Sequence, residues 1–416
     1  MSGRVRALRG FPDIGPADTP AWLALEAAVQ QVLLRYGYAQ VRMPVLEATE
    51  LFARSVGEAT DIVEKEMFSF VDRDKNAMSL RPEGTASAVR LGIDGGLLRN
   101  AQSRLWYTGP MFRHERPQAG RYRQFHQVGV ENFGTAGALA DIEVIAIARD
   151  LLQAAGVLGA VTLEINTLGS ATARAAYRDQ LQQWLRAHAD ALDEDSRQRI
   201  ERNPLRVLDS KNPQTQAALA DAPRLADSLD EESRAHYAAV LEGLAALDIA
   251  WVENPRLVRG LDYYNHCVFE WTTQQLGAQG TVLAGGRYDG LVEQLGGGPV
   301  PACGFAMGCE RVLLLQQALD CVPQAAPVDV YVCHEGGQGR LQALRLAQSL
   351  RQAGWQVLVD GGDGRLKGQI KRAAMARARI VSKDEHADFT LLVAQAPAAL
   401  SEHLQALCPA GAATPS

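Results

Sequence analysis

Arginines, carboxylates and aromatic residues alternate on both sides of a short Pro/Gly-containing turn in the first third of the chain. The runs are Phe112-Arg113-His114-Glu115-Arg116-Pro117 and Arg121-Tyr122-Arg123-Gln124-Phe125-His126-Gln127. Two extended runs around such a turn predict a hairpin, with Arg113 and Glu115 on one face and Phe125 and Gln127 available on the partner strand. This set suits a nucleotide, because a guanidinium grips phosphate and a ring stacks on a base. A solvated hairpin held by salt bridges explains the same residues.

Two other segments carry polar residues in unusual places. Arg81-Pro82-Glu83-Gly84-Thr85 predicts a turn that presents a carboxylate and a hydroxyl together, which suits an ammonium group. Capping of the following helix by Glu83 or Thr85 explains that segment equally well. Leu257-Val258-Arg259-Gly260-Leu261-Asp262-Tyr263-Tyr264 sets an arginine and two tyrosines in an apolar frame. Buried Arg and Tyr side chains need partners, so this segment indicates a site.

Two glycine-containing segments follow. Ala284-Gly285-Gly286-Arg287-Tyr288-Asp289-Gly290 would let a ligand approach the backbone, although Gly-rich turns are common. Gly304-Phe305-Ala306-Met307-Gly308-Cys309-Glu310-Arg311 runs from an apolar strand into a helix with Arg311 in its first turn. Because the positive end of the helix dipole repels cations, an arginine there indicates an anion that shares the site.

The elements that position these residues begin with an amphipathic helix. Asp18-Thr19-Pro20 supplies a capping side chain and an early proline, and apolar residues at helical spacing run from Trp22 to Tyr36. A strand over Val41–Val45 follows. Pro44 within it has no N–H to donate, so this strand is expected to lie at an edge or to break. From about Met67 to Gly134 the pattern is largely β-rich.

The rest of the first domain alternates in character. Residues 170–250 are rich in Ala, Leu, Arg, Asp and Gln and predict a helical insertion, with 10 basic against 14 acidic side chains. Strands are then expected at Leu257–Trp271, Gly280–Ala284 and Ala302–Met307, followed by a helix over Glu310–Ala318. Residues 323–327 read as a linker.

Beyond the linker, strands alternate with helices. Strands over Val328–Cys333 and Trp355–Val359 and a helix over Leu341–Ala353 predict a small α/β domain with a largely parallel sheet. We therefore expect two domains, 1–325 and 326–416, and a disordered tail after Pro409.

Composition excludes several classes of protein. The 416 residues are 47% hydrophobic and 22% charged, with 42 Lys plus Arg against 48 Asp plus Glu and a net charge of −6. This balance argues against coating of nucleic acid by bulk charge, but residues 365–383 hold seven basic and no acidic side chains. No apolar run approaches the ~20 residues of a membrane helix. The six cysteines include no C-x-x-C pair, so we expect reduced thiols, a cytoplasmic protein and no zinc.

Together the chemical segments resemble a histidyl-tRNA synthetase of the class II aminoacyl-tRNA synthetases. The helix and Pro44 strand match the first class motif, residues 113–127 the second, and residues 308–311 the third. Residues 257–270 and 284–291 match two signatures specific to the histidine enzymes. The resemblance runs from Arg9 to about Arg372, nearly nine-tenths of the chain. It implies a mixed α/β and α+β multidomain fold. Its parts are an antiparallel class II sheet core with helices, a helical insertion, and a C-terminal α/β domain like those that bind anticodons.

The resemblance implies a reaction and roles for the ATP site. The family activates histidine with ATP to histidyl-adenylate and pyrophosphate, then transfers it to the terminal adenosine of tRNA(His). Arg113 would bind the α-phosphate, and Arg259 would lie opposite it where charge builds during attack, in place of the metal that other class II enzymes use. The remaining ATP contacts implied by the resemblance come from Glu115, Arg121, Phe125 and Arg311. Mg²⁺ is expected only on the ATP phosphates, and no organic prosthetic group is implied.

The resemblance also implies residues for the amino acid and for tRNA. Glu83, Thr85 and Gln127 would bind the α-ammonium of histidine. Glu131 and Tyr264, with Tyr263 nearby, would read the imidazole nitrogens; Arg259 also borders the bound histidine. Arg116 and Gln118 resemble residues that contact the tRNA acceptor end. A homodimer through the first-motif helix and the Pro44 strand is implied as well.

Two rivals compete with the enzyme. One is the non-enzymatic, histidine-sensing regulatory subunit of ATP phosphoribosyltransferase, which usually lacks the C-terminal domain and the catalytic arginines. This chain keeps Arg113, Arg259 and Arg311 and about 90 residues after the linker. The other is a synthetase-like RNA sensor of starvation-sensing kinases, but the chain has no kinase segment. The sequence departs from the family after Arg372, where the C-terminal end looks shortened or rearranged, so the family's sheet and anticodon contacts are not carried over to that segment.

Overall fold

The computed structural model of the chain describes residues 5–393 apart from short gaps. The gaps are positions 58–59, 61, 100–101, 209, 211, 260, 262, 278–279, 324–327, 335, 363–364, 377–379 and 384–388. Contacts divide the chain into two compact units, Met1–Pro323 and Gln324–Ser416. The expected disordered tail after Pro409 lies outside the described residues.

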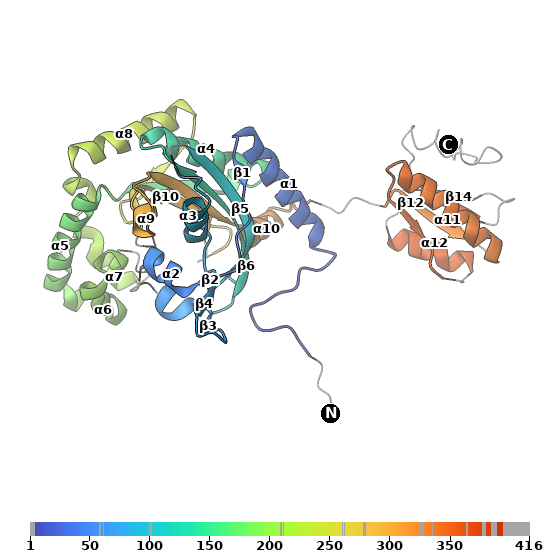
Figure 1. Cartoon of the computed structure of the whole chain (residues 1–416), viewed down its shortest axis with the longest axis horizontal. Helices are drawn as coiled ribbons and strands as arrows, with labels where there is room; N and C mark the ends of the chain where they lie inside the picture. Colours follow the sequence, from blue (N-terminus) through green and yellow to red (C-terminus); the bar gives the residue numbers. More distant parts are fainter. Residues whose placement is uncertain are drawn as a thin grey trace. The chain divides into compact units, whose positions relative to one another are not determined.

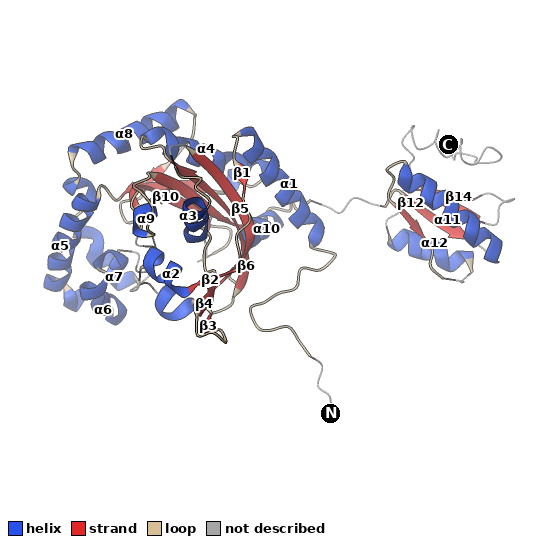
Figure 2. Ribbon diagram, viewed as in Figure 1, coloured by secondary structure: helices blue, strands red, loops and turns tan. Residues whose placement is uncertain are grey.

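The first unit is built on an eight-stranded sheet (Figures 1 and 2). Its six central strands are antiparallel to their neighbours, and the two short edge strands pair parallel. This arrangement confirms the expected antiparallel core. In spatial order the strands are β1 (Ala39–Gln40), β5 (Ser103–Phe112), β6 (Gln124–Phe133), β11 (Ala302–Gly308), β10 (Thr281–Arg287), β9 (Asn265–Thr272), β7 (Thr162–Thr167) and β8 (Val252–Glu253). A small second sheet orders β2 (Leu46–Ala48), β4 (Ala77–Leu80) and β3 (Ser69–Val71).

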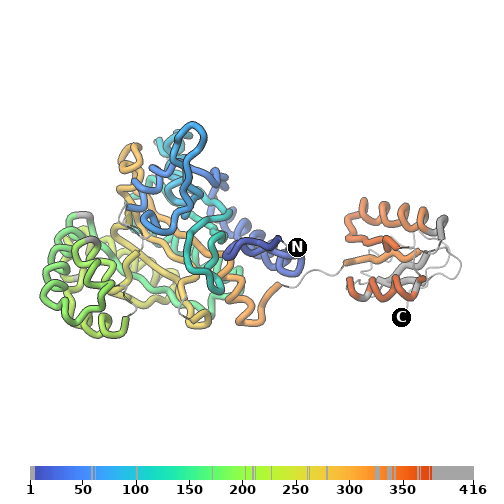
Figure 3. Tube along the Cα trace, turned by 90° about the horizontal axis from the view of Figure 1, so that it is seen from below, coloured from blue at the N-terminus to red at the C-terminus, as the bar shows by residue number. Residues whose placement is uncertain are grey.

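Helices cover the sheet and extend from one end of it. Those packed around the sheets are α1 (Thr19–Arg35), α2 (Thr49–Val56), α3 (Thr85–Asp94), α4 (Ala138–Ala154), α9 (Leu291–Gln294) and α10 (Cys309–Ala318). The insertion holds α5 (Ala171–Ala187), α6 (Glu194–Arg202), α7 (Pro213–Ala218) and α8 (Glu231–Ala246). Of these, α5, α6 and α7 gather at one end of the unit, away from the N-terminal segment (Figures 1 and 3), and α8 packs against α4.

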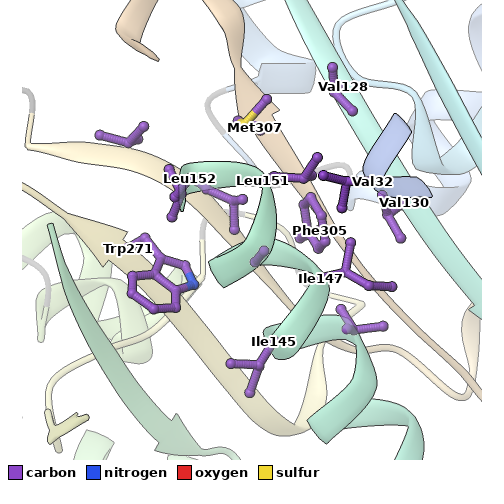
Figure 4. Close-up of a cluster of buried hydrophobic side chains, with 14 of the residues drawn as sticks. Val32, Val128, Val130, Ile145, Ile147, Leu151, Leu152, Trp271, Phe305 and Met307 are labelled. Carbon is purple, nitrogen blue, oxygen red and sulfur yellow. The ribbon is translucent and has the colours of Figure 1, made fainter. Parts of the chain in front are cut away.

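The core lies on one face of the large sheet, and the polar residues of β6 lie on the other. Val128 and Val130 of β6 pack with Phe305, with Val32 of α1 and with Ile147 of α4 (Figure 4). Because side chains alternate along a strand, Gln127, Gly129 and Glu131 point to the opposite face. Burial of the apolar face of β6 fixes the register of this strand. The same register turns the polar side chains of β6 to the opposite face of the sheet, where a ligand could bind.

The Pro44 segment differs from the expected strand. β1 stops at Gln40 and β2 starts at Leu46, so Val41–Val45 forms no strand. The carbonyls of Met43 and Pro44 instead accept hydrogen bonds from Arg81 Nη1, at 3.1 and 3.4 Å. The expected strand does not form, and the chain breaks at this segment, which was the other expectation. Proline has no N–H with which to continue the hydrogen-bond ladder.

Two other local predictions were wrong. Asp18 lies at φ −93° and ψ −31° and its side chain makes no cap, while Thr19 Oγ1 bonds to the Gly15 carbonyl at 2.9 Å. The strand expected from Leu257 begins only at Asn265, because the preceding residues turn toward the cavity described below.

The second unit is a four-stranded sheet in the order β13-β12-β15-β14. Its elements are β12 (Val330–His334), α11 (Gly336–Gln352), β13 (Val357–Val359), α12 (Leu366–Met375), β14 (Ile380–Lys383) and β15 (Phe389–Val393). Among these described strands only β12 and β13 pair parallel, and the other two pairs are antiparallel. The expectation of a largely parallel sheet was wrong for the described strands, because β15 pairs antiparallel with both β12 and β14.

Candidate active site

Most of the predicted site residues line one cavity of about 180 Å³ in the first unit. Its walls come from the loop between β5 and β6, the turn before α3, the segment before β9, strand β10 and the start of α10. The predicted residues brought together there are Glu83, Thr85, Arg113, Glu115, Arg121, Phe125, Gln127, Arg259, Tyr263, Tyr264 and Arg311. Glu131, Arg116 and Gln118 lie outside the lining.

One end of the cavity is crowded with arginines. β5 ends at Phe112, so Arg113 and Glu115 lie just beyond the strand and not within it. Arg113 Nε donates to the Pro82 carbonyl at 2.8 Å, and its guanidinium lies 5.4 Å from the centroid of the Phe125 ring. Glu115 pairs with Arg121 and lies 3.9 Å from Arg113 Nη1. The predicted arginine, carboxylate and ring therefore meet at one place.

Arg311 completes this end from the first turn of α10, where it donates to the Thr281 carbonyl. Burial, and then the nearby charges of Arg121 and Arg113, lower the pKa of Arg311. Burial is also the first cause that lowers the pKa of Arg113. Positive charges held close together and out of water favour a bound anion, because an anion stabilises the charged form of each.

Arg259 faces the cavity from the segment before β9. Its guanidinium pairs with Glu270 of β9 and lies 5.7 Å from the centroid of the Tyr264 ring. Burial lowers the pKa of Arg259, but the carboxylate of Glu270 together with Tyr264 and Tyr263 more than compensates, so the pKa lies above its ordinary value. Glu270 is itself held by Thr281 Oγ1 at 2.8 Å. The buried Nε of Arg259 makes no hydrogen bond within the described chain.

The polar end of the cavity, which adjoins the arginine end at Pro82, carries uncharged donors and carboxyl groups. Glu83 is 4% exposed and its two oxygens accept the backbone N–H groups of Thr85 and Ala86 at 2.6 and 2.9 Å. Glu83 therefore does cap α3, as the alternative held, while it also lines the cavity. Burial raises the pKa of Glu83. Gln127 Oε1 is buried and makes no hydrogen bond within the described chain.

Glu131 lies behind this end and is completely buried. Its carboxyl group accepts hydrogen bonds from Thr85 Oγ1 at 2.8 Å, from Tyr107 Oη at 3.0 Å and from Tyr288 Oη. Burial raises the pKa of Glu131 to about 8. Glu131, predicted to read the imidazole, does not itself line the cavity, because Thr85 and the two tyrosines surround its carboxyl group.

Sequence reasoning missed Tyr107 and Tyr288 as partners of Glu131. The signal for Tyr107 is a pair of glycines: a Cβ on Gly84 or on Gly129 would clash with its ring. Tyr288 comes from the second histidine-type signature, whose Arg287 is fully buried and paired with Asp141 at 2.6 Å. This segment therefore anchors the end of β10 through Arg287 and holds the Glu131 carboxyl group through Tyr288.

Arg116 and Gln118 are exposed in the loop between β5 and β6. The loop closes through reciprocal backbone hydrogen bonds of 3.0 Å between Gln118 and Arg121. Both side chains are therefore presented to solvent beside the cavity and not inside it.

Two features are absent from the part of the chain that the structure describes. No group of three His, Cys, Asp or Glu side chains there is arranged to hold a metal ion. No helix among them is long and apolar enough to cross a bilayer.

The antiparallel sheet, with arginines converging on its open face from motif-like segments, defines a class II aminoacyl-tRNA synthetase fold. The family model described as histidyl-tRNA synthetase matches residues 10–312. The chain belongs to the histidyl-tRNA synthetase family.

Solved structures agree with this assignment. The apo histidyl-tRNA synthetase of S. aureus is 32% identical over 91% of this chain and 91% of that chain, with a TM-score of 0.75. Two more distant structures share the fold. An ATP phosphoribosyltransferase regulatory subunit/histidyl-tRNA synthetase from Bacillus halodurans is 22% identical over 89% of this chain and 97% of that chain, with a TM-score of 0.64. The histidyl-tRNA synthetase from Nostoc sp. PCC 7120 is 18% identical over 97% of this chain and 99% of that chain, with a TM-score of 0.68.

Proposed function

We propose that this protein is a histidine–tRNA ligase that makes histidyl-adenylate from histidine and ATP and then esterifies tRNA(His). The observation that carries the proposal is the cavity, where Arg113, Arg259 and Arg311 converge from three separate segments. A protein that only sensed histidine would not need three guanidinium groups around a second, anionic ligand.

The arginine end is the proposed site for ATP. Arg113, Arg121 and Arg311 would neutralise the phosphates, and Mg²⁺ would arrive on ATP as part of the substrate. Phe125 would stack on adenine, with Glu115 accepting from its amino group. Phosphoryl chemistry depends mainly on positioning and charge neutralisation, which these side chains supply without forming a covalent bond.

Activation would take place between Arg113 and Arg259. The histidine carboxylate attacks the α-phosphorus, the bond from that phosphorus to the bridging oxygen of pyrophosphate breaks, and pyrophosphate leaves. Negative charge on the α-phosphoryl oxygens increases during this step. Arg259, already oriented by Glu270, would stabilise that charge with little reorganisation.

The polar end is the proposed site for histidine. Gln127 Oε1 lacks a partner, and the α-ammonium of histidine would supply one. Glu83 and Thr85 lie at the same end of the cavity. Tyr263, Tyr264 and the covered Glu131 would read the imidazole. Selection follows because an apolar isostere leaves buried polar groups unpaired.

The proposed tRNA surface joins two regions of the first unit. Arg116 and Gln118 are exposed beside the cavity. A groove of about 320 Å³ lies next to Arg259 and is lined by Arg174, Arg178 and Arg206 of the insertion. The insertion is acidic on average, so this local basic lining supports a phosphate-binding face. The second unit is the proposed anticodon-binding domain.

We also propose a cytoplasmic homodimer through α1 and the Pro44 segment. Leu23 and Leu34 of α1 are 59% and 63% exposed, and Val45 and Leu46 are each 37% exposed. Burial of such apolar side chains against a second copy would stabilise the dimer.

The test of the proposed function is charging of a tRNA(His) transcript with labelled histidine in the presence of ATP. The wild-type protein is expected to form histidyl-tRNA, and omission of ATP abolishes it. A protein that binds histidine, folds normally and forms no histidyl-tRNA and no adenylate would favour the regulatory-subunit alternative. Adenylate formation without transfer would place the defect in tRNA recognition, where the divergent C-terminal end lies.

A further inference from the structure

We propose that the N-terminal segment Leu8–Phe11 is a strap that positions the loop bearing Arg113, Glu115 and Arg121. The proposal rests on the proposed function, because it assigns that loop to ATP. The strap residues themselves do not line the cavity. They act on ATP binding through the loop, as positioning residues.

The strap joins the base of the loop through its backbone. The carbonyl of Gly10 accepts hydrogen bonds from the N–H groups of Arg123 and Gln124, at 2.8 and 3.1 Å. The carbonyl of Arg123 in turn accepts from the N–H of Arg113 at 2.9 Å. Arg123 is therefore held on one side by the strap and on the other by the residue proposed to bind the α-phosphate.

The side chain of Arg123 carries the connection further. Its Nε donates to the Glu115 carbonyl at 3.3 Å, and Glu115 pairs with Arg121. Arg123 thus contacts Glu115 directly and is connected to Arg121 through Glu115. A displaced Arg123 would move Glu115 and, through it, Arg121.

Gly10 fits closely against this arginine. It has φ +88°, and a Cβ there would lie 2.9 Å from Arg123 Cγ and 3.0 Å from Cδ. Glycine is therefore required twice, by the left-handed backbone and by the contact with the Arg123 side chain. A turn that made no contact with Arg123 would require glycine only for its left-handed backbone.

An aromatic contact chain holds the strap from its other side. The rings of Phe11 and Phe68 meet edge to face with centroids 5.9 Å apart, and Phe68 and His114 do the same at 5.5 Å. His114 lies in the loop between Arg113 and Glu115, and its N–H donates to the Glu66 carbonyl at 2.6 Å. The strap therefore contacts both arms of the loop, one through Gly10 and one through Phe11 and Phe68.

The test is a pair of glycine substitutions in the full-length protein. In Gly10→Ala the new Cβ displaces Arg123, and we expect the KM for ATP in histidine-dependent pyrophosphate exchange to rise about tenfold, which corresponds to ~1.4 kcal/mol. The KM for histidine should stay within about twofold. Gly37→Ala is the matched control, because Gly37 has φ +73° with open space around its Cα. It carries the same backbone strain and should leave both constants unchanged.

A second pair tests the aromatic arm. Phe11→Ala is expected to raise the KM for ATP several-fold, and Phe11→Tyr to restore it. Phe70→Ala is the control, because Phe70 lies two residues from Phe68 and is 45% exposed. Equal effects of Gly10→Ala and Gly37→Ala, or equal rises in the KM for both substrates, would overturn the strap. Absence of exchange in the wild-type protein would instead contradict the proposed function.

Discussion

The guanidinium of Arg259 is paired with the carboxylate of Glu270 at the wall of the cavity. Glu270 is anchored on β9 and by the hydroxyl of Thr281 on the neighbouring strand β10. The residue proposed to stabilise charge at the α-phosphorus is therefore attached to the sheet and does not depend on the substrate for its orientation. Preorganised charge of this kind is the most effective form of electrostatic catalysis.

The first prediction concerns this anchor. Glu270→Gln keeps the size of the side chain but removes the charge that orients Arg259, so we expect kcat of histidine-dependent pyrophosphate exchange to fall about tenfold. The KM for histidine should change little. Glu293→Gln is the control, because Glu293 is an exposed carboxylate on α9. An unchanged kcat in Glu270→Gln would show that Arg259 is held by other contacts.

The second prediction concerns Glu131 and pH. The pKa of Glu131 is raised by burial from 4.5 to about 8, so the folded protein retains a proton there that the unfolded chain has lost. The stabilisation is complete below about pH 4.5 and is lost as the pH rises through about 8. The free energy of unfolding should therefore decrease across this window by up to ~1.4 kcal/mol per pH unit from this group.

Urea unfolding of the wild-type protein and of Glu131→Gln at pH 6 and pH 8 measures this effect. The amide does not titrate, so the variant should lose less stability between the two pH values than the wild type. Titrating groups distant from Glu131 contribute equally to both proteins. Identical pH dependence in the two proteins would mean that Glu131 titrates near its ordinary value.

The third prediction concerns the basic groove. Arg178→Ala should raise the KM for tRNA(His) several-fold and reduce the slope of log affinity against log salt by about 1, the loss of one phosphate contact. Pyrophosphate exchange, which needs no tRNA, should be unaffected. Arg186→Ala on the same helix is the control, since Arg186 pairs with Glu201 at 2.6 Å and lies outside the groove. Unchanged tRNA affinity in Arg178→Ala would remove the groove from the tRNA surface.

The sequence predicted the chemistry of the cavity better than its geometry. Motif spacing identified Arg113, Glu115, Phe125, Arg259 and Arg311, and the structure brings all five into one cavity. Motif spacing did not identify Tyr107 or Tyr288, which are 24 and 157 residues from Glu131 along the chain. Tyr107 lies on β5, the hairpin partner of β6, whereas Tyr288 meets Glu131 only because β6 pairs with the distant strand β11. Pairing between distant strands is set by the whole sheet and leaves little local signal.

Element prediction failed where tertiary contacts override local pattern. Val41–Val45 has the apolar residues of a strand, but its carbonyls bond to the Arg81 side chain. In the second unit, the helix–strand alternation up to Val359 correctly indicates one parallel pair. The last two described strands, β14 and β15, add antiparallel pairs, so the parallel pattern does not extend to them.

The most direct test of the account is histidine-dependent ATP–pyrophosphate exchange by the wild-type protein and by Arg259→Ala, without tRNA. The wild type should exchange label only when histidine is present. Arg259→Ala, with its fold checked by circular dichroism and thermal unfolding, should be slower by about a hundredfold or more. A folded wild-type protein that shows no histidine-dependent exchange, or an Arg259→Ala variant as active as the wild type, would contradict the account.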